Sequence, residues 1–144
     1  MELHVKYFDE LTPRELYEIL RLRSAVFVVE QQSRYLDTDG KDRDALHVFY
    51  TDGGELAAYL RILKKGVNFD EVSIGRVIAK KRRSGTGSAL VREGIRLAKS
   101  EFGADKIKIA AQTYTREFYE RLGFVKISDE YSIDGIPHIN MILE

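Results

Sequence analysis

The stretch from Val72 to Leu90 constrains the fold of this chain more than any other segment. It begins with an apolar, β-branched run, continues through the cations Lys80-Lys-Arg-Arg83, and reaches Gly85 and Gly87 before a helix-forming sequence. This order predicts a strand, a basic glycine-rich turn and the first turn of a helix. Glycine lets a backbone approach an anion closely, and the free N–H groups of a first helical turn attract negative charge. The segment therefore predicts a binding site for the pyrophosphate of a phosphorylated cofactor.

The basic run has two other interpretations, a solvated surface or an RNA contact. Lys+Arg and Asp+Glu balance at 23 each, whereas nucleic-acid-binding domains usually carry a marked basic excess. No Gly-Lys-Ser/Thr follows the glycines, so the segment is not a P-loop for ATP or GTP hydrolysis. Phosphate binding is the favoured interpretation.

Composition sets the broad class. The 144 residues, 44% of them hydrophobic, suit a single domain over residues 1–144. The absence of cysteine excludes disulfides, thiolate metal sites and a cysteine nucleophile. No apolar run approaches the ~20 residues of a membrane span, and the N-terminus lacks the apolar core of a signal peptide. We expect a cytoplasmic protein with no membrane, nucleic-acid or metal partner.

Hydrophobic periodicity and turn signals predict an α/β chain. A capping box with proline at the first helical position stands at Thr12-Pro-Arg-Glu15, and Asp134-Gly135 is typical of a type I′ hairpin turn. Gly103 ends the helical pattern that begins at Thr86. The expected strands cover 3–8, 46–51, 56–63, 72–79, 106–111, 124–133 and 136–143. One or two helices are expected over 13–31, and further helices over 86–102 and 115–122.

Two motifs together give a family resemblance over nearly the whole chain. Arg82-Arg-Ser-Gly-Thr-Gly87 fits the pattern Gln/Arg-x-x-Gly-x-Gly/Ala, and Glu117-Phe-Tyr-Glu-Arg-Leu-Gly-Phe124 is a short helix that ends in Gly-Phe. At this spacing they resemble the GNAT superfamily of N-acetyltransferases. The resemblance implies a mixed, mostly antiparallel sheet of six to seven strands with helices on both faces. Segments 23–31, 35–40, 74–77 and 134–138 are further similar to bacterial ElaA-type acetyltransferases.

The resemblance implies acetyl-CoA as co-substrate and no metal. Its pantetheine arm would run along the end of the central strand at Val77 and Ile78, with Ala79 as the alternative because the connection to Gly85 is short. Its pyrophosphate would bind the amides of residues 83–88. The expected cofactor-binding set is Val77, Ile78, Arg82, Arg83, Ser84, Gly85, Thr86, Gly87, Ser88, Gln112 and Tyr119.

Direct acetyl transfer to an amine requires that the amine lose a proton and that the thiolate leaving group be stabilised or protonated. A lysine-like amine with a pKa near ~10.4 is mostly protonated at pH 7, and the thiol leaving group has a pKa near ~8.5. Tyr119 matches the family's tyrosine that reaches the sulfur and is expected to assist thiolate departure, although a core aromatic role is the alternative. Candidate bases are Glu30, whose burial would raise its pKa, His138, His47, or a chain of water molecules.

Charged residues elsewhere leave alternatives open. Asp37, Asp39, Asp42 and Asp44 fail the EF-hand spacing and are expected in a solvated loop, with an acidic rim that attracts a cationic amine as the alternative. Arg23 and Arg76 are expected in ion pairs with Glu30 or a loop aspartate, or in contact with an acceptor carboxylate.

The sequence thus predicts an acetyl-CoA-dependent N-acetyltransferase acting on a small-molecule or peptide amine. A non-catalytic acyl-CoA sensor that binds a protein partner is the alternative function. The acceptor is not identified by the sequence, and a homodimer through the final hairpin is left open.

Overall fold

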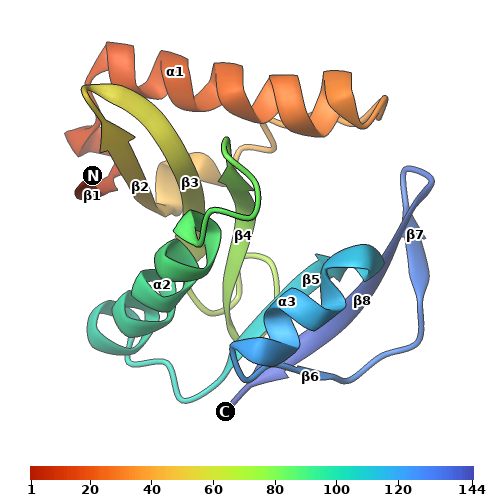
Figure 1. Ribbon diagram of the computed structural model, residues 1–144. Coiled ribbons are helices and arrows are strands. Elements are labelled where there is room, and N and C mark those ends of the chain that lie inside the picture. Colours follow the sequence, from red (N-terminus) through yellow and green to blue (C-terminus); the bar gives the residue numbers. More distant parts are fainter.

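The structure, a computed structural model, describes all residues 1–144. Helices are interspersed among the strands along the chain, which includes two runs of three successive strands (Figure 1). Short 3-10 turns lie at Phe8–Glu10, Asp42–Asp44 and Thr113–Thr115, and a π-helical segment at Ser24–Glu30 directly extends α1. The elements are β1 (Glu2–Tyr7), α1 (Pro13–Arg23), β2 (Leu46–Asp52), β3 (Glu55–Leu63), β4 (Val72–Ala79), α2 (Thr86–Phe102), β5 (Ile107–Gln112), α3 (Arg116–Arg121), β6 (Val125–Lys126), β7 (Tyr131–Ile133) and β8 (Ile136–Leu143).

One mixed sheet contains eight strands in the order β1-β2-β3-β4-β5-β8-β6, with β7 paired to β8. Every neighbouring pair is antiparallel except β4 and β5. The expected strand over 124–133 is wrong, because it divides into β6 and β7. The Asn140 N–H donates to Ser128 Oγ at 2.8 Å, so a side chain occupies a donor that a continuous strand needs. This division gives one strand more than the six to seven expected.

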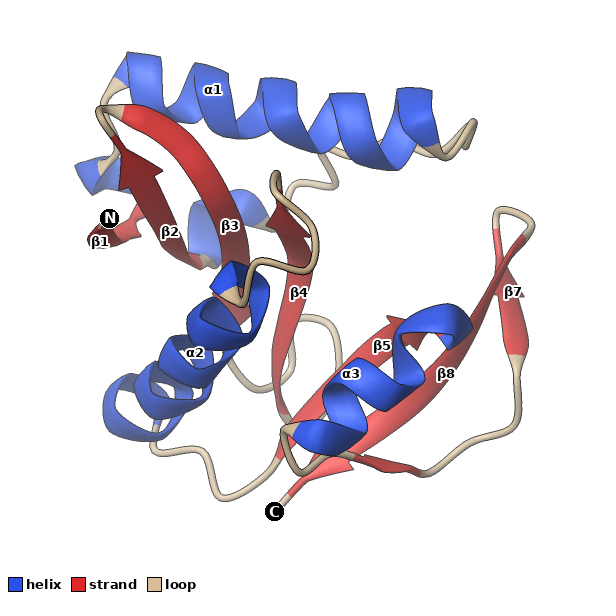
Figure 2. Cartoon of the chain, in the orientation of Figure 1, coloured by secondary structure: helices blue, strands red, loops and turns tan.

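Helices cover both faces of the sheet, as expected (Figure 2). On one face α2 buries Leu90, Val91 and Leu97 against β3 and β4 in the larger core, and α3 adds half-buried aromatic side chains. On the other face α1 places Ile19 and Leu22 against a smaller core. Both helices carry apolar residues at the three- and four-residue spacing that directs one face toward a sheet. None of the helices combines the length and the apolar character needed to span a membrane.

Several local signals are confirmed. Thr12 Oγ1 accepts from Glu15 N–H at 3.1 Å, while Thr12 N–H donates to Glu15 Oε1 at 2.8 Å, which completes the capping box before α1. Asp134 and Gly135 have φ values of 50° and 81°, as a type I′ turn between β7 and β8 requires. Each of these signals depends on residues at most three positions apart and needs no distant contact to form.

The central opening of the sheet lies between β4 and β5. These parallel strands pair only at Val72–Ile107 and Ser73–Lys108, and they diverge beyond that point (Figure 1). β4 also carries a bulge: Gly75 lies opposite Arg61 and Ile78 opposite Tyr59, so that β4 has one residue more than β3 between these pairs. Arg76 stands in the bulge with a left-handed φ of 53°. A bulge bends its strand and takes the extra residue's backbone N–H and C=O groups out of the hydrogen-bond ladder between the strands. β4 therefore turns away from β5, and backbone groups at the bulge are left without a strand partner.

The acidic loop between α1 and β2 is not solvated as a whole, which corrects the expectation for that segment. Asp37 and Asp42 are buried and Asp39 is half-buried, whereas Asp44 remains exposed. Arg23 Nε donates to Asp37 at 2.9 Å and Arg23 Nη1 to Asp42 at 2.7 Å. The expectation that Arg23 forms an ion pair inside the fold is therefore confirmed, with loop aspartates as its partners.

Arg61 and Arg76 extend these contacts into one network. Arg61 Nη2 donates to Asp39 at 2.6 Å, and Arg76 Nε donates to Asp37 at 2.9 Å. Three arginines thus neutralise three aspartates, so these carboxylates do not form the acidic rim considered as an alternative. The network connects α1, the loop, β3 and the bulge of β4.

Replacement of Arg23 by alanine should strongly destabilise the fold. The Arg23 guanidinium is fully buried, and its loss leaves Asp37 and Asp42 without a charged partner in the interior. Breaking a buried ion pair in this way costs about 3–5 kcal/mol of unfolding free energy, measurable by urea denaturation. The exposed Arg21→Ala is the matched control and should change stability by less than about 0.5 kcal/mol. Equal effects of the two variants would contradict the assigned role of Arg23.

Acid should remove the stabilisation that Asp39 provides. Burial alone raises the pKa of Asp39, but hydrogen bonds and charge from Arg61 outweigh it and hold that pKa well below its usual range. A depressed folded-state pKa contributes stability above the unfolded pKa near ~3.9, and this is lost as pH falls through the folded value. The difference in unfolding free energy between wild type and Asp39→Asn should therefore narrow from pH 5 to pH 2.5. A constant difference across that range would contradict this assignment.

Candidate active site

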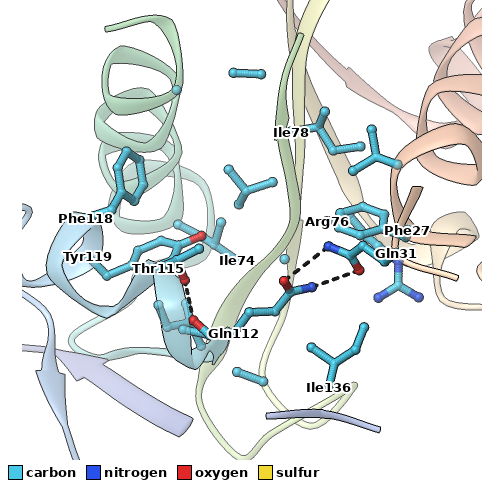
Figure 3. A pocket seen from close by; sticks show the side chains of 18 of the residues that line it. Phe27, Gln31, Ile74, Arg76, Ile78, Gln112, Thr115, Phe118, Tyr119 and Ile136 are labelled. Carbon is cyan, nitrogen blue, oxygen red and sulfur yellow. Dashed lines mark hydrogen bonds between the residues drawn. The ribbon is translucent and has the colours of Figure 1, made fainter. Parts of the chain in front are cut away.

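A cavity of about 1140 Å³ occupies the opening between β4 and β5 (Figure 3). Its walls come from the π-helical segment, β4, the basic turn, β5, α3 and the β7–β8 hairpin. All but two of the site residues expected from the sequence line it, the exceptions being Thr86 and the candidate base His47. The parted strands therefore bring together groups that are up to about a hundred positions apart in the chain.

The strand wall of the cavity is the second half of β4. Val77, Ile78 and Ala79 all line the cavity. An extended ligand arm could therefore lie along β4 at either of the two positions expected from the sequence. The first three residues of β4 are buried, whereas the rest of the strand, apart from Ile78, is half-buried because it faces this space. The bulge at Arg76 supplies unpaired backbone groups at the point where the strands diverge.

One end of the cavity is electropositive. Lys80, Lys81, Arg82 and Arg83 line it, and α2 begins directly afterwards with Gly85 as its N-cap at a φ of 82°. The first intrahelical hydrogen bond is donated by Ala89 N–H to the Gly85 carbonyl at 3.0 Å, so the preceding amides of the helix have no partner within it. Basic side chains and first-turn amides without a partner in the helix lie together at this end, which are the features expected of an anion site.

The turn that leads into α2 is built from small residues. A Cβ built on Gly87 would lie 3.6 Å from Ala79 Cβ, an ordinary contact, so the packing of the protein itself does not require glycine there. Ser84 Oγ lies 2.7 Å from the Lys81 carbonyl oxygen and 2.9 Å from Thr86 Oγ1, which holds the turn together. Thr86 therefore supports the turn with its side chain, although that side chain does not line the cavity.

Tyr119 extends from α3 toward β4 inside the cavity (Figure 3). Its ring packs edge-on against Phe118 and Phe124, with centroid distances of 5.0 and 5.7 Å. Burial in these aromatic surroundings, with a smaller effect of Tyr114, raises the pKa of the Tyr119 hydroxyl above its ordinary value of 10. The hydroxyl is therefore protonated at neutral pH and available as a hydrogen-bond donor to a ligand.

A pair of glutamines crosses the opening. Gln112, at the end of β5, and Gln31, after the π-helical segment, exchange two side-chain amide hydrogen bonds, each 3.1 Å long (Figure 3). Gln112 was expected in the cofactor-binding set, and it does line the cavity, but its amide is engaged with Gln31. Gln31 was not expected as a site residue, because nothing in the sequence relates it to a position 81 residues away.

The candidate bases have different surroundings. Glu30 lines the cavity, but half of its side chain is exposed and it forms an ion pair with Arg82, so the burial expected for Glu30 is not found. His138 Nδ1 lies 2.7 Å from the Ile136 carbonyl oxygen, which can only accept, so Nδ1 carries the proton. In the neutral ring, His138 Nε2 is then left with a free lone pair.

His47 lies outside the cavity. It is fully buried, and its Nε2–H donates to the Asp42 carbonyl at 2.9 Å while Nδ1 accepts from the Tyr59 hydroxyl at 2.6 Å. Burial lowers the pKa of His47 and keeps the ring neutral. Both nitrogens are thus occupied by structural hydrogen bonds, and His47 is not positioned to serve as the base.

A cleft in a mixed sheet, with an anion site at the start of the following helix, defines an acyl-CoA N-acyltransferase fold. A family model described as "Acetyltransferase (GNAT) domain" matches residues 10–144. The chain belongs to this GNAT acetyltransferase family and is an acyltransferase enzyme, as its resemblance implied.

Individual relatives agree with this assignment. Protein ElaA of Escherichia coli is 37% identical, with 96% of this chain and 93% of ElaA covered, and a UPF0039 protein of Synechocystis is 38% identical over 94% and 90%. The crystal structure of an acyl-CoA N-acyltransferase from Pseudomonas aeruginosa superposes with a TM-score of 0.92 at 35% identity, covering all of both chains. The similarity to ElaA-type proteins that the sequence indicates is therefore confirmed.

Proposed function

We propose that this enzyme transfers an acetyl group from acetyl-CoA directly to a primary amine. The observation that carries the proposal is the continuous cavity that begins at the basic turn and passes along β4 to the Tyr119 side chain. The diphosphate would bind the first-turn amides of α2, where Arg83 and Ser88 line the cavity, and the pantetheine arm would follow Val77 and Ile78. A thioester at the far end of that arm would then lie near Tyr119.

In the proposed reaction the amine nitrogen attacks the thioester carbonyl carbon, the C–S bond breaks, and coenzyme A leaves as a thiolate. Tyrosine, with an ordinary pKa near ~10, is a weaker acid than a thiol near ~8.5. Because burial raises the pKa of Tyr119 further, its hydroxyl would stabilise the thiolate by donating a hydrogen bond rather than by giving up its proton. The thiolate then takes a proton from water or from the protonated base.

The proton lost by the amine needs an acceptor. His138 supports this role because its Nδ1 is fixed as the donor to Ile136 and its Nε2 is free, while the residue lines the same cavity. Glu30 and ordered water are the other candidates that we retain from the sequence. We propose His138 as the first of these to examine, since its tautomer already suits a general base.

We further propose that the acceptor is a small molecule or a peptide with a free amine. The acceptor would enter where the β7–β8 hairpin lines the cavity, beside His138. Location in the cytoplasm remains a prediction of the sequence, and a homodimer through the final hairpin remains open.

The direct test combines isothermal titration of the protein with coenzyme A and a panel of amines assayed for acetyl-CoA-dependent thiol release. We expect heat on titration and turnover with at least one amine class. Absence of heat and of any thermal shift at millimolar coenzyme A would refute the proposed cofactor. Binding without turnover by any amine would favour the sensor alternative.

An acidic side chain in the first turn of α2 should weaken cofactor binding without lowering the stability of the fold. Ser88→Asp places a carboxylate where the diphosphate would bind, yet an acidic residue at a helix N-terminus contributes about 0.3–1 kcal/mol to folding. We expect at least a ~10-fold increase in the Kd of coenzyme A with an unchanged or higher melting temperature. Ala89→Asp is the control, because Ala89 is exposed and does not line the cavity. Equal weakening by both variants would count against the site.

Removal of the Tyr119 hydroxyl should slow catalysis without loss of cofactor. Tyr119→Phe keeps the ring packed between Phe118 and Phe124 and removes the donor to the leaving sulfur. We expect kcat to fall by ~10²–10⁴-fold while the Kd of coenzyme A changes little. The exposed Tyr17→Phe, on the outer side of α1, should leave both values unchanged. An unaltered kcat under conditions where chemistry limits the rate would exclude Tyr119 from the mechanism.

A further inference from the structure

An ion pair on the cavity wall joins the π-helical segment to the basic turn. Glu30, at the end of the π-helical segment, pairs with Arg82 in the basic turn, and both side chains line the cavity. The two residues are 52 positions apart, and both side chains are at least half exposed to solvent. An ion pair in water contributes little to folding, about 0–1 kcal/mol, so it can be broken at low cost.

The same Arg82 belongs to the group of cations expected at the diphosphate. Lys80, Lys81 and Arg83 line the cavity and take part in none of the ion pairs of this structure, so Arg82 alone in this group is held by a carboxylate. A diphosphate offers a guanidinium more negative charge than one carboxylate does, together with several acceptor oxygens. Glu30 and the cofactor therefore compete for Arg82.

We propose that Arg82 exchanges Glu30 for the diphosphate when coenzyme A binds. The inference rests on the proposed coenzyme A site. Before binding, Glu30 is neutralised by Arg82. After binding, Arg82 holds the diphosphate, and the Glu30 carboxylate stays on the cavity wall without this partner. Binding of coenzyme A therefore includes the cost of breaking this ion pair.

The exchange predicts a defined pattern in coenzyme A affinity. Glu30→Gln removes the competitor for Arg82, so titration calorimetry should show a Kd lower by roughly two- to five-fold, the range expected for an exposed ion pair. Glu93→Gln is the matched control: Glu93 also forms an exposed ion pair, with Arg96 on α2, and lies outside the cavity. That control should leave the Kd unchanged.

The same substitution in an Arg82→Ala variant distinguishes competition for Arg82 from simple charge repulsion between Glu30 and the cofactor. In Arg82→Ala, which itself weakens coenzyme A binding, the further change Glu30→Gln should have no effect on the Kd, because there is no arginine to release. An unchanged or higher Kd for Glu30→Gln alone would overturn the inference. The same tightening in both backgrounds would also overturn it, since that result reflects repulsion between Glu30 and the cofactor. Failure of the wild type to bind coenzyme A would instead refute the proposed function.

Discussion

The early separation of β4 from β5 is the constraint on which the rest of this molecule depends. Two residue pairs hold the parallel strands together, and beyond them each strand must satisfy its backbone groups elsewhere. β5 does so through an unbroken antiparallel ladder with β8, from Ile107–Leu143 to Gln112–His138. β4 remains paired to β3, but its bulge at Arg76 leaves backbone groups facing the opening. A gap in the middle of a sheet is therefore stable because both of its edges are anchored to other strands.

The arginine–aspartate network holds the bulged edge in place. A left-handed φ at a residue other than glycine costs free energy, and it persists only where the surroundings determine it. Arg76 gains such surroundings from Asp37 and from the rings of Phe27 and Tyr35, 5.9 and 5.1 Å from its guanidinium carbon. Because Asp37 is bound in turn by the buried Arg23, the shape of β4 depends on the end of α1 and on the loop that follows. A change in the loop at Asp37 would therefore alter both the end of α1 and the cavity wall formed by β4.

Those parts of the fold that depend on local chemistry were predictable from the sequence. The capping box at Thr12, the turn at Asp134-Gly135 and the helix end at Gly103 each involve neighbouring residues, and all three are found. The strand, glycine turn and helix order of residues 72–90 also located the electropositive end of the cavity. The distant pairings were not predictable in the same way. The Gln31–Gln112 contact and the burial of Asp37 depend on partners that only the folded chain brings near.

The distribution of charge explains how a chain with no net charge has an electropositive end in its cavity. The arginines of the network, Arg23, Arg61 and Arg76, are matched by aspartates and add little long-range potential. The cations of the basic turn are mostly unmatched, so the potential is concentrated at one end of the cavity. Away from this end lies an aromatic environment in which Tyr119 keeps its proton. The cavity therefore combines cations that suit phosphate binding with a neutral hydrogen-bond donor among aromatic rings, and the proposed reaction needs both.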